Sequence, residues 1–161
     1  MNKLIKEIMF ALALTLASLH GLATADAHEI KFGSLVIGHP WSRQSPMVAE
    51  VAAGFLKITN TGTEDDTLVK ATAEIAPVVQ LHEMKMDGDI MTMAEVKGGI
   101  VIPAGQTVEL KPMGLHIMFL QVKEQPVVNT SFKGSLTFEK AGTVEVEFEV
   151  VEPKATMEHV Q

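Results

Sequence analysis

Residues 143–151 read Thr-Val-Glu-Val-Glu-Phe-Glu-Val-Val, in which apolar and acidic side chains alternate. Successive side chains of a β-strand point to opposite faces of the sheet, so an alternation with a period of two indicates a strand. One face would carry Val144, Val146, Phe148 and Val150, and the other face would carry three glutamates. Such a pattern is typical of an antiparallel strand with one face on a core and the other in water.

Other apolar runs of similar length precede this strand along most of the chain. Clusters of Gly, Pro, Asn and Asp separate them, and none has a convincing helical period. The expected strands are residues 30–37, 51–59, 67–73, 78–86, 90–96, 100–102, 107–110, 115–122, 131–138 and 143–151. Many short strands at this spacing, in a chain of 161 residues, predict a single all-β domain built as a sandwich or a barrel.

The N-terminal segment has the pattern of a secretory signal peptide. Two lysines form a short basic region, an apolar run follows, and Ala-Asp-Ala at 25–27 fits the A-x-A cleavage pattern. We therefore expect residues 1–27 to be a cleaved signal peptide, so that the mature chain begins at His28 and is periplasmic. The alternative is a retained membrane anchor, for which the apolar run is short against the roughly 20 residues of a spanning helix.

The sequence contains no cysteine and has a net charge of −7. A chain without cysteine has no thiolate for redox exchange or for a zinc finger, and no attachment point for the lipid of a lipoprotein. The acidic balance argues against nucleic acid as a partner. We expect residues 28–152 to form one domain and the polar segment 153–161 to be a flexible tail.

Residues 81–93 read Leu-His-Glu-Met-Lys-Met-Asp-Gly-Asp-Ile-Met-Thr-Met and hold four of the ten methionines. Asp-Gly between two strand-like runs is a strong hairpin signal. A two-residue Asp-Gly turn would place His82 opposite Met93 and Met84 opposite Met91, all on one face. Directly opposed Cβ atoms are about 4.5–5.5 Å apart, so an imidazole nitrogen and a thioether could bind one metal ion there.

A second pair of candidate ligands, His116 and Met118, is two residues apart in a strand-like run and therefore shares a face. Two imidazoles and two thioethers form a soft ligand set. Thioethers select Cu(I), and they offer little to zinc, calcium or magnesium. We interpret His82, Met93, His116 and Met118 as the ligands of a copper site. Met86 shares the hairpin face, but it is expected beside the turn and outside the site.

These residues also have an ordinary structural explanation. A methionine on an apolar face usually fills a core. A lone histidine in a β-protein is more often part of a hydrogen-bonded structure than a ligand. The residues alone leave open a structural β-sandwich module without metal, although two His-x-Met units together with Met93 favour the metal site. We interpret His39 and Trp41 as structural.

On these residues the chain resembles the periplasmic PCu(A)C copper chaperones. Their motif is a histidine, ten residues, a methionine, about twenty-one residues and then His-x-Met. In this sequence ten residues separate His82 from Met93, and His116 follows after twenty-two. The similarity covers roughly residues 30–151. Its further landmarks are Trp41-Ser42-Arg43 with Pro46, Gly54-Phe55, Asn60, Asp65-Asp66-Thr67-Leu68, Pro103-Ala104-Gly105 and Leu110-Lys111-Pro112. One departure is Met113, where the family usually has glycine.

The resemblance implies a cupredoxin-like Greek-key β-sandwich with one solvent-near Cu(I) ion per chain. It also implies delivery of copper to the CuA centre of cytochrome c oxidase, often alongside a thiol-bearing partner of the Sco type. We expect a monomer and no enzyme activity, because no nucleophile–base pair stands out in the sequence. A blue-copper electron-transfer site is not expected either, since such a site needs a cysteine.

Two questions remain open at this level. A copper resistance or storage protein would use the same site without an oxidase to serve. The sequence also leaves open whether Met84, Met91 or Met113 assist the site, and whether Met157 and His159 of the tail help to capture copper.

Overall fold

The computed structural model describes residues 29–153, and within them eleven strands join into one continuous sheet. No α-helix occurs in this part of the chain, so the prediction of an all-β protein is confirmed. No helix among these residues has the length and apolarity needed to cross a bilayer. The expected signal peptide (1–27) and the expected tail (153–161), apart from Pro153, lie outside the described residues.

The strands are short and turns of a few residues connect most of them. They are β1 (Glu29–Phe32), β2 (Leu35–Arg43), β3 (Val51–Asn60), β4 (Asp66–Ala73), β5 (Val78–Asp87), β6 (Ile90–Glu95), β7 (Ile100–Ile102), β8 (Thr107–Leu110), β9 (Leu115–Leu120), β10 (Ser131–Phe138) and β11 (Gly142–Val151).

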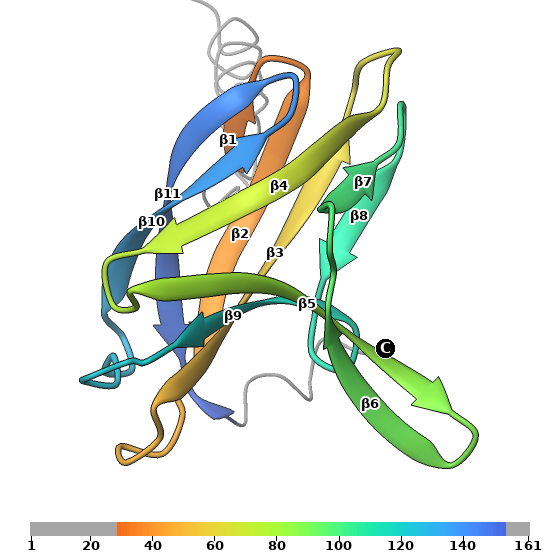
Figure 1. Cartoon of the computed structure of the whole chain (residues 1–161). Helices are drawn as coiled ribbons and strands as arrows, with labels where there is room; N and C mark the ends of the chain where they lie inside the picture. Colours follow the sequence, from red (N-terminus) through yellow and green to blue (C-terminus); the bar gives the residue numbers. More distant parts are fainter. Residues whose placement is uncertain (1–28, 154–161) are drawn as a thin grey trace, which may run out of the picture.

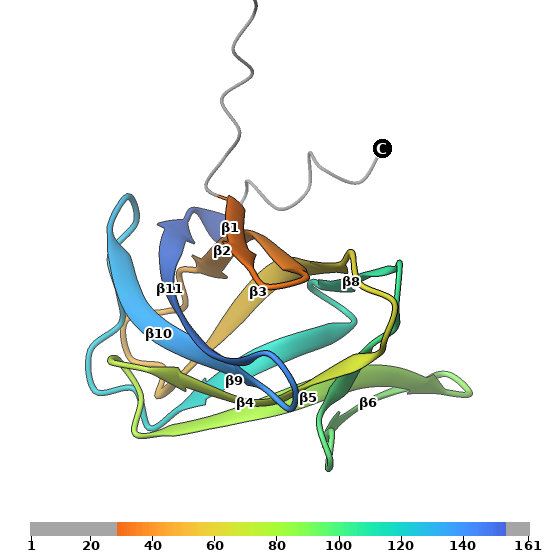
Figure 2. The ribbon, with the colours of Figure 1, turned by 90° about the horizontal axis from the view of Figure 1, so that it is seen from above.

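The order of strands across the sheet is β6-β5-β9-β3-β2-β11-β10-β4-β7, with β1 added to β2 and β8 added to β3. Some neighbouring strands are far apart in the sequence, such as β5 with β9 and β4 with β10. The long connections between such strands are the crossovers of a Greek-key sandwich. The last strand, expected to be antiparallel, is antiparallel to β10 but parallel to β2. The sheet curls around an interior, and the outer ends of β5 and β6 extend beyond it (Figures 1 and 2).

The expected strand at residues 30–37 is wrong in its extent, because the chain turns back within it. β1 ends, Gly33 adopts a φ of 60°, and β2 begins two residues later and pairs with β1. A positive φ is unfavourable for residues with a Cβ, so this glycine is the local signal of the turn. β2 then runs on and places Trp41 opposite Phe55 of β3.

The interior contains a cluster of three phenylalanine rings. The ring centre of Phe119 in β9 lies 5.4 Å from that of Phe132 in β10 and 5.5 Å from that of Phe148 in β11. Gly54 of β3 makes this packing possible, because a Cβ there would lie 2.7 Å from the Phe119 ring. Phe148 is fully buried and the glutamates of β11 are exposed, which confirms the two faces predicted for residues 143–151.

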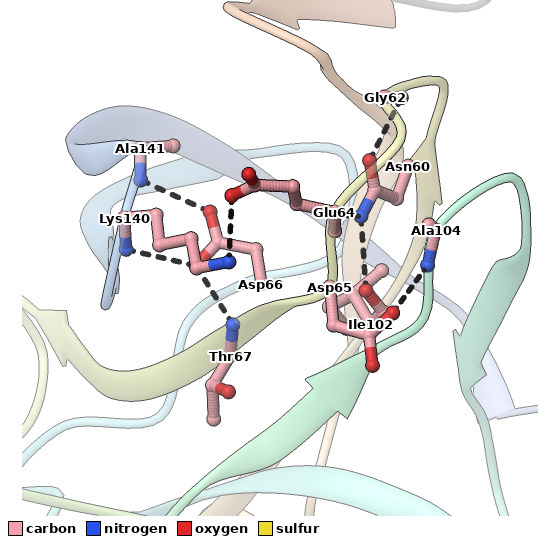
Figure 3. A network of polar contacts seen from close by, with 10 residues as sticks. All are labelled: Asn60, Gly62, Glu64, Asp65, Asp66, Thr67, Ile102, Ala104, Lys140 and Ala141. Carbon is pink, nitrogen blue, oxygen red and sulfur yellow. Dashed lines mark hydrogen bonds and ion pairs between the residues drawn. The ribbon is translucent and has the colours of Figure 1, made fainter.

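Hydrogen bonds of polar side chains link several loops at one end of the sandwich, which Figure 3 shows. The buried carboxylate of Asp66 accepts hydrogen bonds from three backbone N–H groups, those of Thr67 (2.7 Å), Lys140 (2.9 Å) and Ala141 (3.0 Å). The neighbouring Asp65 accepts one, from the backbone N–H of Ala104 at 2.9 Å. Asp66 therefore joins the start of β4 to the β10–β11 turn.

Replacing Asp66 by alanine should lower the free energy of unfolding by about 3 kcal/mol, since a buried N–H group without a partner costs about 1–3 kcal/mol. Urea unfolding followed by the fluorescence of Trp41, the single tryptophan, measures this loss. Asp65→Ala is the matched control, because it removes one exposed hydrogen bond and should cost about 1 kcal/mol. Equal losses in the two variants would contradict the anchoring role of Asp66.

Candidate metal centre

The two predicted histidines lie directly opposite each other on adjacent strands. His82 of β5 pairs with His116 of β9, and their ring centres are 5.8 Å apart. Their chain neighbours Leu81 and Ile117 also pair, and both are buried in the core. Because side chains alternate along a strand, the histidines lie on the opposite, outer face of the sheet.

The predicted register of the β5–β6 hairpin is wrong by one step. The two-residue turn is Gly88-Asp89, not Asp87-Gly88, and Gly88 adopts a φ of 63°. Asp87 therefore pairs with Ile90 and belongs to the strand. A glycine at the first turn position suits a type II′ turn, so the segment Asp-Gly-Asp contains two overlapping hairpin signals. The sequence alone does not decide between them.

The shifted turn changes which residues are opposed but not which face they share. Met93 lies opposite Met84, and Glu95 lies opposite His82, so the predicted pairs His82–Met93 and Met84–Met91 are wrong. Each partner moves by two positions, which preserves the face because side chains alternate with a period of two. Met93 is thus the diagonal neighbour of His82, and its side chain is 48% exposed.

The second predicted methionine lies on the other side of the histidine pair. Met118 is opposite Gln80 of β5 and opposite Ala53 of β3, and it is half-buried. The structure therefore brings together His82, His116 and Met118 on neighbouring positions of one face. Met93 approaches from the hairpin, one strand further out. Diagonal neighbours are about 7–8 Å apart, which long side chains can still bridge.

Hydrogen bonds to the two imidazoles determine which nitrogen of each is available. His116, which is 5% exposed, donates from Nδ1 to the carbonyl oxygen of Gly114 at 3.0 Å. Its Nε2 lone pair is then the one free to bind a ligand. His82 donates from Nε2 to Oε1 of Gln80 at 3.0 Å, and its buried Nδ1 has no hydrogen-bond partner among the described residues. A buried polar atom without a partner is unfavourable unless something binds there.

The electrostatic surroundings favour neutral imidazole at His82. Its pKa is lowered from the usual value, first because burial disfavours the charged ring and second because His116 lies close by. The carboxylate of Glu95, opposite on β6, acts in the other direction and raises it. Neutral imidazole is the form that binds metals, so the surroundings keep His82 ready as a ligand.

Residues not assigned to the site from the sequence lie around the histidines. Gln80 and the carbonyl of Gly114 orient the two rings, as the outer partners of metal-binding histidines commonly do. Phe55 stands beside His116 with ring centres 6.5 Å apart, and Trp41 packs on Phe55 at 4.5 Å. The period of two could have indicated Gln80, because it is two residues before His82. Nothing local indicates a backbone carbonyl.

The donor set suits a soft ion. Among residues 29–153 no group of three or more His, Cys, Asp or Glu side chains is arranged to hold a metal ion. Met93 and Met118 lie on the same face as the histidine pair, and their thioethers are donors that favour a soft ion. Two imidazoles that bind one ion have ring centres roughly 5–6 Å apart, given metal–nitrogen bonds of about 2 Å, and the observed 5.8 Å fits.

Comparison with known proteins identifies the family of the chain. Residues 35–150 match the family model described as "Putative lipoprotein LpqE-like". The chain belongs to the LpqE-like family. This is the family of the PCu(A)C proteins, so the resemblance seen in the sequence is confirmed.

Individual PCu(A)C relatives agree with the family model. "Putative lipoprotein Lxx21020" of Leifsonia xyli subsp. xyli (strain CTCB07) is 30% identical over 132 residues, covering 82% of this chain and 78% of that protein. The structure "Copper-bound PCuAC domain from PmoF2" has a TM-score of 0.69 at 25% identity and covers 78% of this chain and 99% of that one. "Apo PCuAC domain from PmoF1" has a TM-score of 0.67 at 26% identity, with 78% and 100% covered. The fold is thus the cupredoxin-like β-sandwich of the PCu(A)C domains.

The departure from the PCu(A)C pattern at Met113 has a visible structural consequence. Met113 adopts a φ of 68°, in the tight turn that the hydrogen bond from the N–H of Gly114 to the carbonyl of Lys111 closes. A positive φ explains why glycine is usual at this position. The Met113 side chain is 63% exposed, so it does not fill the core.

Proposed function

We propose that the protein is a periplasmic Cu(I) carrier that holds one ion between His82, Met93, His116 and Met118. The observation that supports this best is the buried Nδ1 of His82, which has no hydrogen-bond partner within residues 29–153 and belongs to a ring directly opposite His116. Thioethers from Met118 on one side and Met93 on the other would complete a four-ligand soft site.

A carrier role is favoured over electron transfer by the same donor set. Blue-copper sites need a cysteine thiolate, and the sequence contains none. One ligand, Met93, is on an exposed hairpin strand, whereas the histidines are on strands that pack on the core. An ion held in this way lies near the surface, where an acceptor's ligands can replace those of the carrier. We propose that the protein acts as a monomer without enzyme activity.

We further propose that the acceptor is the CuA-bearing subunit of cytochrome c oxidase, with a Sco-type thiol protein as a second partner. Export through a cleaved signal peptide would place the carrier in the compartment where that acceptor is exposed. One relative and the family model are described as putative lipoproteins, which is consistent with export. A resistance or storage protein would use the same site but would have no acceptor.

Transfer to an acceptor tests this role directly. The Cu(I)-loaded protein is mixed with the soluble, metal-free CuA domain of an oxidase, the two are separated, and copper is measured in each. We expect most of the copper to leave the carrier. Met47→Ala, which changes an exposed loop residue outside the site, is the control and should behave like the wild type. Retention of copper by the carrier would favour storage.

Competitive loading with Cu(I) and Zn(II) tests the ligand set. Because two of the four proposed ligands are thioethers, we expect the desalted protein to retain copper and to lose zinc. Metal analysis of the desalted protein measures this. A protein that kept zinc in preference to copper would contradict the ligand set, and a protein that kept neither would be the structural module considered above.

A further inference from the structure

Four methionines form two opposed pairs on one face of the β5–β6 hairpin. Met84 pairs with Met93. Met86 pairs with Met91, and this second pair lies nearer the turn. We call these two pairs the thioether ladder. Opposed Cβ atoms are about 4.5–5.5 Å apart, and the two pairs are separated by two residues, or about 7 Å, along the strands.

The ladder is not part of the hydrophobic core. Met86 is 61% exposed, Met91 is 42% exposed and Met93 is 48% exposed. β6 is the first strand of the sheet order, and among the described strands it pairs with β5 alone. Figure 1 shows this end of the hairpin extending away from the sandwich. Core filling, the usual role of methionine, therefore does not explain three of these four side chains.

The opposite face of the hairpin has a different chemistry. It carries Glu83 and Lys85, which form an ion pair at 2.8 Å, and Thr92, whose hydroxyl donates to the carbonyl of Lys85. This face also carries Ile90, which pairs with Asp87, and Ala94, which pairs with Glu83. All four thioethers lie on the other face, in a row that leads toward His82.

We propose that the thioether ladder is a second binding site for a soft monovalent cation, Cu(I) or Ag(I), with weaker affinity than the histidine site. Flexible, unbranched side chains let the thioethers of Met84, Met86 and Met91 converge on one ion while Met93 serves the histidine site, and such ligands select Cu(I). The pair Met84–Met93 lies next to His82, so an ion bound to the ladder could pass to the histidine site by exchanging one thioether at a time. Binding at the ladder itself requires no histidine and goes beyond the proposed function.

Silver titration of the protein labelled at its methionine methyl groups tests the proposal, because Ag(I) mimics Cu(I) without redox chemistry. We expect the first equivalent to shift the methyl signals of Met118 and Met93. The second equivalent should shift those of Met86 and Met91. The exposed Met47, which lies in a loop outside both sites, is the internal reference that should not move. Unmoved Met86 and Met91 signals at two equivalents, or an equal shift at Met47, would overturn the proposal.

Two sets of variants separate the ladder from the histidine site. Met86→Leu with Met91→Leu keeps the apolar volume and should reduce the retained silver from about two ions per chain to about one. Met47→Leu, which changes an exposed methionine outside both sites, is the control and should retain both ions. In His82→Ala with His116→Ala, the shifts of Met86 and Met91 should persist while the tight ion is lost.

The variants test the two sites separately, so either proposed site can be contradicted while the other stands. If the histidine variant still held the tight ion, the proposed four-residue site would be wrong and the ladder would stand. If the double leucine variant retained two ions, the ladder would be wrong and the four-residue site would stand. Methyl spectra of the metal-free variants show at the start whether each is folded.

Discussion

Replacing His116 by alanine should weaken Cu(I) binding by at least about a hundredfold, because even the outer partners of metal ligands are worth 10–100-fold in affinity. His116 is the most buried of the four proposed ligands and is oriented by the Gly114 carbonyl. Met118→Ala should also bind Cu(I) much more weakly. Competition with a chromophoric Cu(I) chelator measures the affinity of each variant.

Met86→Ala is the matched control for these two substitutions. The sequence placed Met86 beside the turn, and in the structure it pairs with Met91. It remains one step further from the histidines than Met84, so the affinity for the tightly held ion should not change. If Met86→Ala reduced that affinity as much as Met118→Ala does, the four-residue site would be wrong.

The affinity for Cu(I) should fall steeply as the pH decreases from about 7 to about 5. A histidine must be neutral to bind a metal, and its ordinary pKa is about 6.5, so protons compete for both imidazoles. Once both are protonated in the free protein, two protons leave for each ion bound, and the affinity changes by about a hundredfold per pH unit. Burial lowers the pKa of His82, so competition at this residue begins at lower pH than for an exposed histidine.

Replacement of His82 by methionine isolates its contribution to that slope. A thioether is not protonated in this range, so His82→Met should show a shallower dependence, approaching about tenfold per pH unit. Chelator competition from pH 7 to 5, corrected for protonation of the chelator, compares the two proteins. Equal slopes would mean that His82 is not a ligand, and the significance of its unpartnered Nδ1 would be lost.

Much of the fold follows from local patterns in the sequence. The alternation in residues 143–151 fixes which face of β11 is buried, and most separators rich in glycine and proline mark real turns. The division between β1 and β2 was missed because a single glycine, Gly33, makes that turn between two apolar segments. The parallel pairing of β11 with β2 has no local signal at all, because it depends on how the whole sheet curls.

The shared faces of the candidate residues were predictable, but their mutual geometry was not. Spacing and period place His82 on one face with Met93, and His116 on one face with Met118, and the strand registers agree. The hairpin register could not be predicted, since Asp-Gly and Gly-Asp are both acceptable two-residue turns. The pairing of β5 with β9 is a contact between distant segments, so the direct opposition of the histidines needed the structure.

The parallel contact between β2 and β11 also has a consequence for how the chain folds. Glu149 pairs with Trp41, so strands near the two ends of the described chain must meet before the sheet is complete. Chains dominated by such distant pairings fold slowly, in milliseconds to seconds, because closing a long loop precedes the gain from contacts. β9, which carries His116, is joined through β3 to β2. In the unfolded chain the imidazoles and thioethers are therefore separate groups, and they lie together only once β5 has paired with β6 and β9.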